Sequence, residues 1–123
     1  VGFITEKRIE NAGRYDRAFA DLEGCIDVPV RSPRIKHVYH LYMVRAKDRD
    51  GLLAHLNDRG VEAKIHYPVP VHLQPAAARL GSKKGDLPFT EEDAGRIITL
   101  PAHQHLSAEE IEYAIEQVRA FYR

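Results

Sequence analysis

The chain has 123 residues, with 18 Lys and Arg balanced by 18 Asp and Glu, seven His and a single Cys. This length suits one domain with a single core, and the balanced charge excludes a field that would draw the protein to nucleic acid or to an acidic membrane. One cysteine, Cys25, cannot form an internal disulfide and favours a reducing compartment. The sequence contains neither an apolar run of about 18 residues nor an evident signal peptide. We therefore expect one cytoplasmic domain over residues 1–123.

A helix is expected first, over about Thr5–Leu22, with Thr5 as its cap and Gly24 after its end. Its apolar side chains recur at steps of three and four residues, which places them on one face. They are Ile9, Ala12, Tyr15, Phe19 and Leu22. Residues 28–34, VPVRSPR, contain two prolines and no helical period, so they are predicted to form a connection.

The segment His37–Arg45, HVYHLYMVR, carries the strongest strand signal because it is rich in β-branched and aromatic residues and lacks Gly and Pro. Both of its faces are apolar, which is typical of a strand that is buried on both sides. In a chain this small, one face is expected to be covered by another domain or subunit. We therefore predict an exposed apolar patch around Val38, His40 and Tyr42, or around their neighbours on the opposite face.

Residues 47–60, KDRDGLLAHLNDRG, predict a second helix. Asp48 or Asp50 can cap its start, and Gly60 stands where a left-handed terminating residue belongs. The residues that follow, Val61–Tyr67, alternate in polarity and predict a second strand. Pro68 ends that strand, because proline cannot donate a hydrogen bond to a sheet.

The last third of the chain begins with a predicted surface turn, GSKKGD, over residues 81–86. A short helix with an acidic first turn is expected from Thr90, and a third strand over Ile97–Leu100 is ended by Pro101. The glycines around Lys83 and Lys84 do not have the spacing of a phosphate-binding loop.

A final helix has a complete start signal, with a capping box and a hydrophobic staple. The box is formed by Ser107 and Glu110, and the staple by Leu106 and Ile111. The order of elements predicts an α+β fold, in which a small three-stranded sheet, antiparallel or mixed, has helices packed on one face.

The segment KIHYPVPVHLQP, residues 64–75, concentrates three prolines with two histidines and a tyrosine. Residues that precede proline are held in extended geometry, so the loop is expected to be stiff. It can then hold His66, Tyr67 and His72 in place at little further entropic cost.

Three kinds of reaction centre are weighed against simpler interpretations. Four histidines could converge on a metal ion, but the sequence has no metal-binding motif of the HExxH or CxxC kind, so hydrogen-bonded surface histidines are favoured over a metal site. These histidines are His66, His72, His103 and His105. Packing is favoured over thiolate chemistry for Cys25, and an ion-paired surface position over Schiff-base chemistry for Lys64.

Four blocks of the sequence occur in a familiar order: HVYHLYMVR, RDGLLAHLNDRGVEAKIHYPVPVHLQPA, GDLPFTEEDAGRIITLPAH and LSAEEIEYAIEQVRAFY. Together with KRIENAGRYDRAF upstream, they resemble the C-terminal part of the DegT/DnrJ/StrS family of sugar aminotransferases. The resemblance implies the small C-terminal domain of an aspartate-aminotransferase-fold (fold type I) enzyme that uses pyridoxal phosphate (PLP). Such enzymes work as cytosolic homodimers and move an amino group from glutamate to a keto sugar nucleotide, in the biosynthesis of surface polysaccharides, glycans or antibiotic sugars. The HYPVPVHLQP form is most similar to members that act on UDP-linked acetamido sugars, including 3-keto uronates.

The resemblance also implies what these residues do and what they lack. His66 and Tyr67 fall where the small domain reaches toward the sugar, and His72 and Lys64 are further candidates for substrate contact. No residue corresponds to the catalytic lysine, which belongs to the large domain, so this chain alone is expected to be inactive and to hold no PLP. The alternative is a free-standing, non-enzymatic binding or regulatory module that keeps the small-domain fold.

Overall fold

The computed structural model describes residues 1–123 as four α-helices, three strands and two 3-10 helices. In chain order they are α1 (Gly2–Ala18), β1 (Ile26–Asp27), β2 (Tyr42–Ala46), α2 (Arg49–Asp58), η1 (Val71–Leu73), η2 (Pro75–Leu80), α3 (Pro88–Arg96), β3 (Ile97–Leu100) and α4 (Ala108–Phe121). No helix combines the length and the apolar character that crossing a membrane requires.

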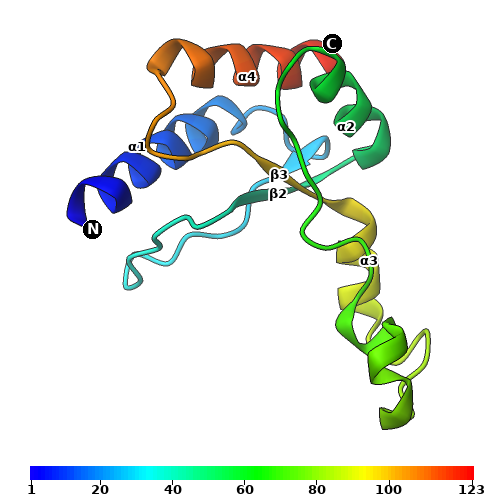
Figure 1. Cartoon of the computed structure of the whole chain (residues 1–123). Coiled ribbons are helices and arrows are strands. Elements are labelled where there is room, and N and C mark those ends of the chain that lie inside the picture. Colours follow the sequence, from blue (N-terminus) through cyan, green and yellow to red (C-terminus); the bar gives the residue numbers. More distant parts are fainter.

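The three strands form one antiparallel sheet in the order β1-β2-β3. Helices α1, α2 and α4 lie together on one side of this sheet, and its other side is not covered by any helix (Figure 1). The predicted α+β class, with helices on one face, is confirmed, and the sheet is antiparallel rather than mixed.

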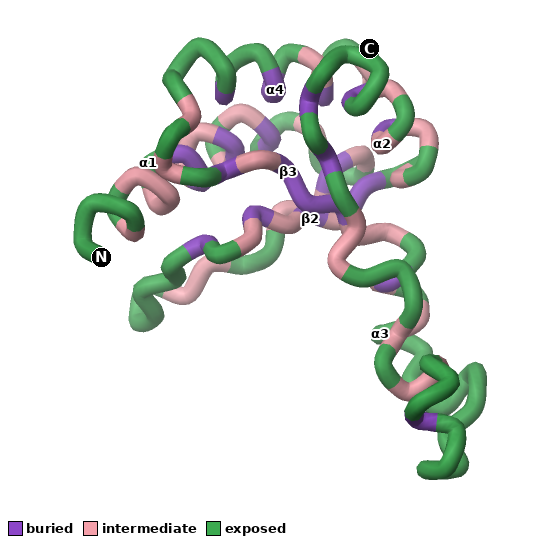
Figure 2. Tube along the Cα trace, viewed as in Figure 1, coloured by how far each residue is buried: buried purple, intermediate pink, exposed green.

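The core lies between the sheet and these three helices (Figure 2), and aromatic rings fill the space between α1 and β2. Tyr15 stacks on Phe19 and on Tyr42 at centroid distances of 5.6 and 4.8 Å. The Tyr15 hydroxyl donates to the Pro101 carbonyl at 2.8 Å, so the buried phenol keeps its hydrogen bond. Burial raises the pKa of both tyrosines above the ordinary value.

Helix α4 begins as predicted. The Ser107 side chain accepts a hydrogen bond from the Glu110 backbone N–H, and the Glu110 carboxylate accepts one from the Ser107 N–H. This reciprocal box satisfies two backbone donors that the helix itself cannot pair.

Residues 68–96 form an arm that extends away from the sheet, and most of its residues are exposed (Figures 1 and 2). The arm contains η1, η2 and α3. Glu91 of α3 holds the parts of the arm together, because its carboxylate accepts hydrogen bonds from His72 Nε2 at 2.9 Å and from the Gly85 N–H at 2.8 Å. Helix α3 starts at Pro88, two residues before the predicted Thr90, and proline fits a first helical position because no N–H is needed there.

Two predicted boundaries are wrong at the N-terminal end of the chain. Helix α1 starts at Gly2 with Val1 as its N-cap, so Thr5 lies inside the helix, and α1 ends at Ala18. A short strand, β1, follows the helix where none was predicted, because Ile26 pairs with Ala46 across the sheet. A strand of two residues is too short for an alternation of polar and apolar side chains to be recognised in the sequence.

One predicted strand is shorter than expected, and another does not form. Strand β2 begins at Tyr42 instead of His37, and the residues before it take an irregular path in which Tyr39 adopts a left-handed backbone, with φ of 47°. Residues 61–67 do not form a strand, and only one bridge, between Lys64 and Thr99, joins them to β3. The Ala63 N–H bonds locally to the Val61 carbonyl and the Asn57 side chain, so it is not available to a sheet ladder.

Burial alternates along β2, so this chain covers one face of the strand and leaves the other less covered, as expected for a face that meets another domain. Tyr42 and Val44 face the helices and are each 1% exposed, whereas Met43 on the opposite face is only half-buried. The patch prediction is therefore wrong for Tyr42. It is confirmed for Val38, which is 52% exposed, and for His40, which is also exposed, whereas the opposite-face neighbour Met43 is half-buried.

Candidate functional site

The candidate site lies at the free edge of β3, where residues 64–66 approach the strand. Lys64 and Thr99 exchange two backbone hydrogen bonds, with N–O distances of 3.1 and 2.8 Å. Residues paired across an antiparallel bridge project to the same face, and so does the residue two positions along the strand. Lys64, His66 and Thr99 are thereby placed on one side of the sheet.

The His66 ring is held by one hydrogen bond to the protein. Its Nδ1 lies 3.0 Å from Thr99 Oγ1, while Nε2 has no protein partner. The Tyr67 ring meets the imidazole edge-on, with a centroid distance of 5.3 Å. His66 therefore presents one nitrogen that is free to bond a ligand.

A cavity of about 240 Å³ opens in front of His66 and Lys64. Most of its charged or titratable side chains are basic, and Glu62 is the acidic one. The lining includes Arg8, His40, Glu62, Lys64, His66 and His103. Such a surface offers hydrogen-bond donors to sugar hydroxyls, carboxylates or phosphates.

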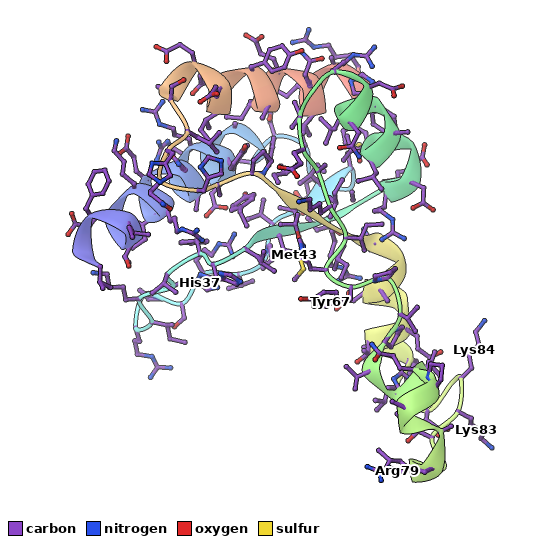
Figure 3. The ribbon with its side chains drawn as sticks, in the orientation of Figure 1. His37, Met43, Tyr67, Arg79, Lys83 and Lys84 are labelled. Carbon is purple, nitrogen blue, oxygen red and sulfur yellow. The ribbon has the colours of Figure 1, made fainter.

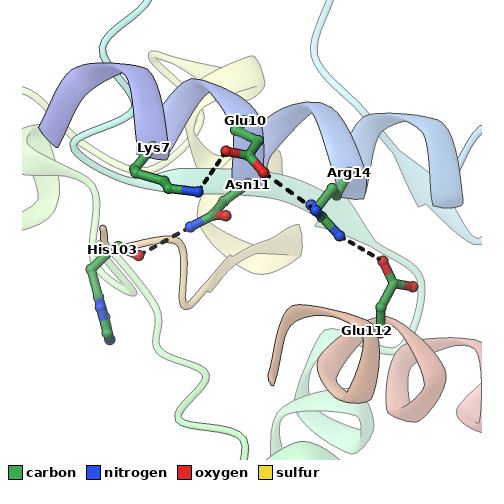
Figure 4. A network of polar contacts seen from close by, with 6 residues as sticks. All are labelled: Lys7, Glu10, Asn11, Arg14, His103 and Glu112. Carbon is green, nitrogen blue, oxygen red and sulfur yellow. Dashed lines mark hydrogen bonds and ion pairs between the residues drawn. The ribbon is translucent and has the colours of Figure 1, made fainter. Parts of the chain in front are cut away.

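Two anchors from α1 fix the walls of this cavity. Arg8 Nη1 donates to the backbone carbonyls of Tyr39 and His40 at 3.0 and 2.9 Å, which ties the irregular segment before β2 to the helix. The buried Asn11 amide donates to the His103 carbonyl at 3.0 Å, and His103 is shown beside it in Figure 4. Both anchors join residues more than 30 positions apart, so sequence periodicity gave no sign of them.

Lys64 sits at the rim of the cavity. Its side chain is 59% exposed, and its ammonium lies 2.6 Å from a Glu62 carboxylate oxygen. This hydrogen bond lowers the pKa of the Glu62 carboxyl below its ordinary value. The ion-paired surface position expected from the sequence is confirmed.

Tyr67 and His72 lie outside the cavity. Tyr67 is 68% exposed and, like Met43, lies on the side of the sheet without helices (Figure 3). His72 belongs to the arm, where its side chain is 8% exposed and bonded to Glu91. The structure therefore brings Lys64 and His66 together, and it does not bring His72 into the same cavity.

No three His, Cys, Asp or Glu side chains come close enough together to hold a metal ion. Of the four histidines weighed for such a site, His72 pairs with Glu91. The His103 and His105 rings lie 6.2 Å apart, and His103 Nδ1 accepts from the His105 backbone N–H at 3.3 Å.

Whether this chain could hold PLP covalently depends on its lysines, because a lysine holds PLP as a Schiff base. Such a lysine must be desolvated to act as a nucleophile near neutral pH. None of the six lysines of this chain is buried. These residues therefore do not fit the covalent site of the cofactor.

Sequence reasoning missed Thr99. It is 7% exposed and, with Asn11, is one of two polar residues in the buried set. The available signal was a single hydroxyl in the otherwise apolar strand Ile97–Leu100. What it bonds could not be deduced without the bridge to Lys64.

This arrangement, an antiparallel sheet with helices on one face, is the fold of sugar aminotransferases of PLP fold type I. The chain superposes on Streptomyces venezuelae DesV, solved in complex with a ketimine intermediate, with a TM-score of 0.91 and 37% identity over 96% of this chain and 32% of that one. A protein of Streptococcus pneumoniae, solved in PLP and PMP forms, gives TM-scores of 0.84 and 0.83 at 27% identity, over 96% of this chain and 31% and 30% of those chains.

A model of the DegT/DnrJ/EryC1/StrS aminotransferase family matches residues 1–119, and the chain belongs to this family. It is 40% identical over 113 residues to the dTDP-3-amino-3,4,6-trideoxy-alpha-D-glucose transaminase of Streptomyces venezuelae, covering 92% of this chain and 30% of that protein. It is 38% identical over 120 residues to a "pleiotropic regulatory protein" of Geobacillus stearothermophilus, covering 97% and 32%. The chain thus spans about a third of the length of the curated relatives it matches.

Proposed function

We propose that residues 1–123 are the C-terminal small domain of a PLP-dependent aminotransferase. The complete enzyme moves an amino group from glutamate to the keto group of a nucleotide-linked sugar, acts in the cytoplasm as a homodimer, and serves surface polysaccharide, glycan or antibiotic sugar biosynthesis. Family membership supports the reaction class, and relatives about three times as long support a larger domain elsewhere in the polypeptide.

In this proposal the chain supplies substrate contacts and no catalytic residue. Because none of its lysines is buried, the lysine that holds PLP lies in the large domain, and the 123-residue chain alone neither binds the cofactor nor transaminates. The sheet face without helices, with Met43 and Tyr67 on it, packs on the large domain when the enzyme is complete (Figure 3).

One observation carries the substrate assignment: His66 keeps a free Nε2 at a cavity lined mainly by basic side chains. His66 donates to the sugar or to its acidic group, and Lys64 adds a cation at the rim. Tyr67 covers the same substrate, and His72 acts on it indirectly, by holding the loop through its hydrogen bond to Glu91. A UDP-linked 3-keto acetamido sugar is the proposed substrate class.

The alternative is a non-enzymatic binding or regulatory module. Its support is the name of the Geobacillus relative, and that relative is itself about three times as long as this chain. The transaminase relatives and the sugar aminotransferase structures favour the enzyme.

The test uses the complete polypeptide that carries this chain. Trapping an aldimine with borohydride on a lysine outside residues 1–123, together with amino transfer from glutamate to a keto sugar nucleotide, is the expected result. His66→Ala should weaken binding of dTDP-glucose and UDP-N-acetylglucosamine by about tenfold, the worth of one hydrogen bond to a charged or polar ligand group. The matched control is His105→Ala, an exposed histidine outside the cavity, which should bind as the wild type does. A complete protein without a trappable aldimine, or a His66→Ala variant with wild-type affinity for both nucleotide sugars, contradicts the proposal.

A further inference from the structure

Thr99 is the residue of β3 whose side chain contacts His66. It pairs with Met43 of β2 on one side and with Lys64 on the other. Its neighbours Ile98 and Leu100 pair with Val44 and Tyr42 on the core face, so the Thr99 side chain projects to the opposite face. Thr99 is nevertheless 7% exposed, because the segment that carries His66 covers it.

Three hydrogen bonds join Thr99 to this segment. Two run between its backbone and that of Lys64, and the third joins its hydroxyl oxygen and His66 Nδ1 at 3.0 Å. The bridge fixes the spacing of the two chains, and the β-branched threonine has few rotamers available in a strand. The Tyr67 ring packs edge-on against the imidazole, and the Thr99 hydroxyl makes the one side-chain hydrogen bond to it.

We propose that Thr99 is a positioning residue that sets the ring orientation and the proton placement of His66. When the hydroxyl donates to Nδ1, the proton of the neutral ring lies on Nε2, the nitrogen without a protein partner. His66 then meets its ligand as a hydrogen-bond donor. This inference rests on the proposed function in so far as the ligand is a nucleotide sugar.

The proton placement selects the chemistry of the ligand. A donor at Nε2 suits the acceptor oxygens of a sugar hydroxyl, a uronate carboxylate or a diphosphate, and disfavours a group that can only donate.

The first test measures proton placement directly on the complete polypeptide. Two-dimensional NMR on ¹⁵N-histidine-labelled protein should show His66 as a single tautomer with the proton on Nε2. Thr99→Val keeps the β-branched shape and removes the hydroxyl, so it should convert His66 to a mixture of tautomers. Thr99→Ser, which restores the hydroxyl, should recover the single form. His66 signals that are identical in wild type and Thr99→Val overturn the inference.

The second test uses the complete polypeptide with dTDP-glucose and UDP-N-acetylglucosamine as unreactive probes, measured by calorimetry. Thr99→Val should raise Kd by about fivefold, the loss expected for one orienting hydrogen bond, and Thr99→Ser should restore it. The effect should vanish in a His66→Ala background, because Thr99 acts through that ring. An equal loss in both backgrounds refutes the positioning role. A His66→Ala variant with unchanged Kd refutes the proposed substrate contact instead, and the tautomer measurement then still decides whether Thr99 orients the ring.

Discussion

Removing the Asp16 carboxylate should destabilise the chain by about 2–3 kcal/mol. Asp16 Oδ1 accepts a hydrogen bond from the Tyr42 hydroxyl at 2.8 Å, and the carboxylate also accepts two from the Arg31 guanidinium at 3.0 and 3.1 Å. In Asp16→Ala the phenol of Tyr42, which is 1% exposed, loses its acceptor. A buried donor left unpaired costs about 1–3 kcal/mol, and the partly exposed ion pair adds at most about 1 kcal/mol.

The assay is urea unfolding followed by circular dichroism. With a slope of about 2 kcal/mol per molar, the midpoint should fall by about 1–1.5 M. Tyr42→Phe alone should cost about 1 kcal/mol, and the double variant should lose less than the sum of the two, because no hydroxyl then remains unpaired.

A matched control comes from the Asp21–Arg119 pair. It has the same two-pronged geometry, with N–O distances of 2.7 Å, but its carboxylate is 63% exposed. Asp21→Ala should therefore shift the midpoint much less than Asp16→Ala. Equal shifts, or additive losses for Asp16→Ala and Tyr42→Phe, would refute the reasoning that burial of the Tyr42 hydroxyl sets the magnitude.

Three further outcomes are expected. Ser107→Ala should lower the free energy of unfolding in urea by about 1 kcal/mol, since it removes the N-cap side chain of α4, and Ser107→Asp should restore most of that stability. Equal losses of stability in both variants would contradict the capping role. Burial raises the folded-state pKa of Tyr15 and Tyr42, so their contribution to stability is present below about pH 10 and is lost as the pH rises above it. The chain has six tyrosines, so the relevant part of the 295 nm absorbance change is the part that Tyr15→Phe and Tyr42→Phe remove. That part should appear only together with the loss of circular dichroism, and its appearance in a still-folded chain would count against this. The hydrogen bond from His72 lowers the folded-state pKa of the Glu91 carboxyl. Glu91 therefore contributes to stability above about pH 4.5, and this contribution is lost as the pH falls through the lower folded-state pKa. In acid unfolding, Glu91→Gln should lack this pH-dependent loss of stability, and an unfolding curve identical to that of the wild type would speak against it.

The open face of the sheet indicates where the large domain of the proposed enzyme would pack. Helices α1, α2 and α4 cover one face, while the face that carries Met43 and Tyr67 lacks a helix (Figures 1 and 3). His66 lies on that open face together with Thr99 and lines the cavity. A second domain packed on that face would enclose the substrate between itself and His66.

Local sequence determined the elements whose signals lie within a few residues of one another. The capping box of Ser107 and Glu110 specifies the start of α4, Asp48 accepts the Gly51 N–H at the start of α2, and Gly60 ends that region with a φ of 76°. Strand β3 also has its predicted bounds, since Pro101 cannot continue it. Each signal acts through neighbouring backbone groups, so no distant partner is needed.

Only the tertiary structure decided which segments pair and what the site contains. The tract around Val38 has strand-forming residues but no partner strand, and the alternating tract 61–67 gains a single bridge. A strand exists only where another backbone lies alongside it, and Thr99, which joins Lys64 and His66, is more than 30 residues from both. The sequence alone therefore identified His66 and Lys64 as candidates, while the free Nε2 and the hydroxyl behind the ring follow from chain segments that meet only in the folded protein.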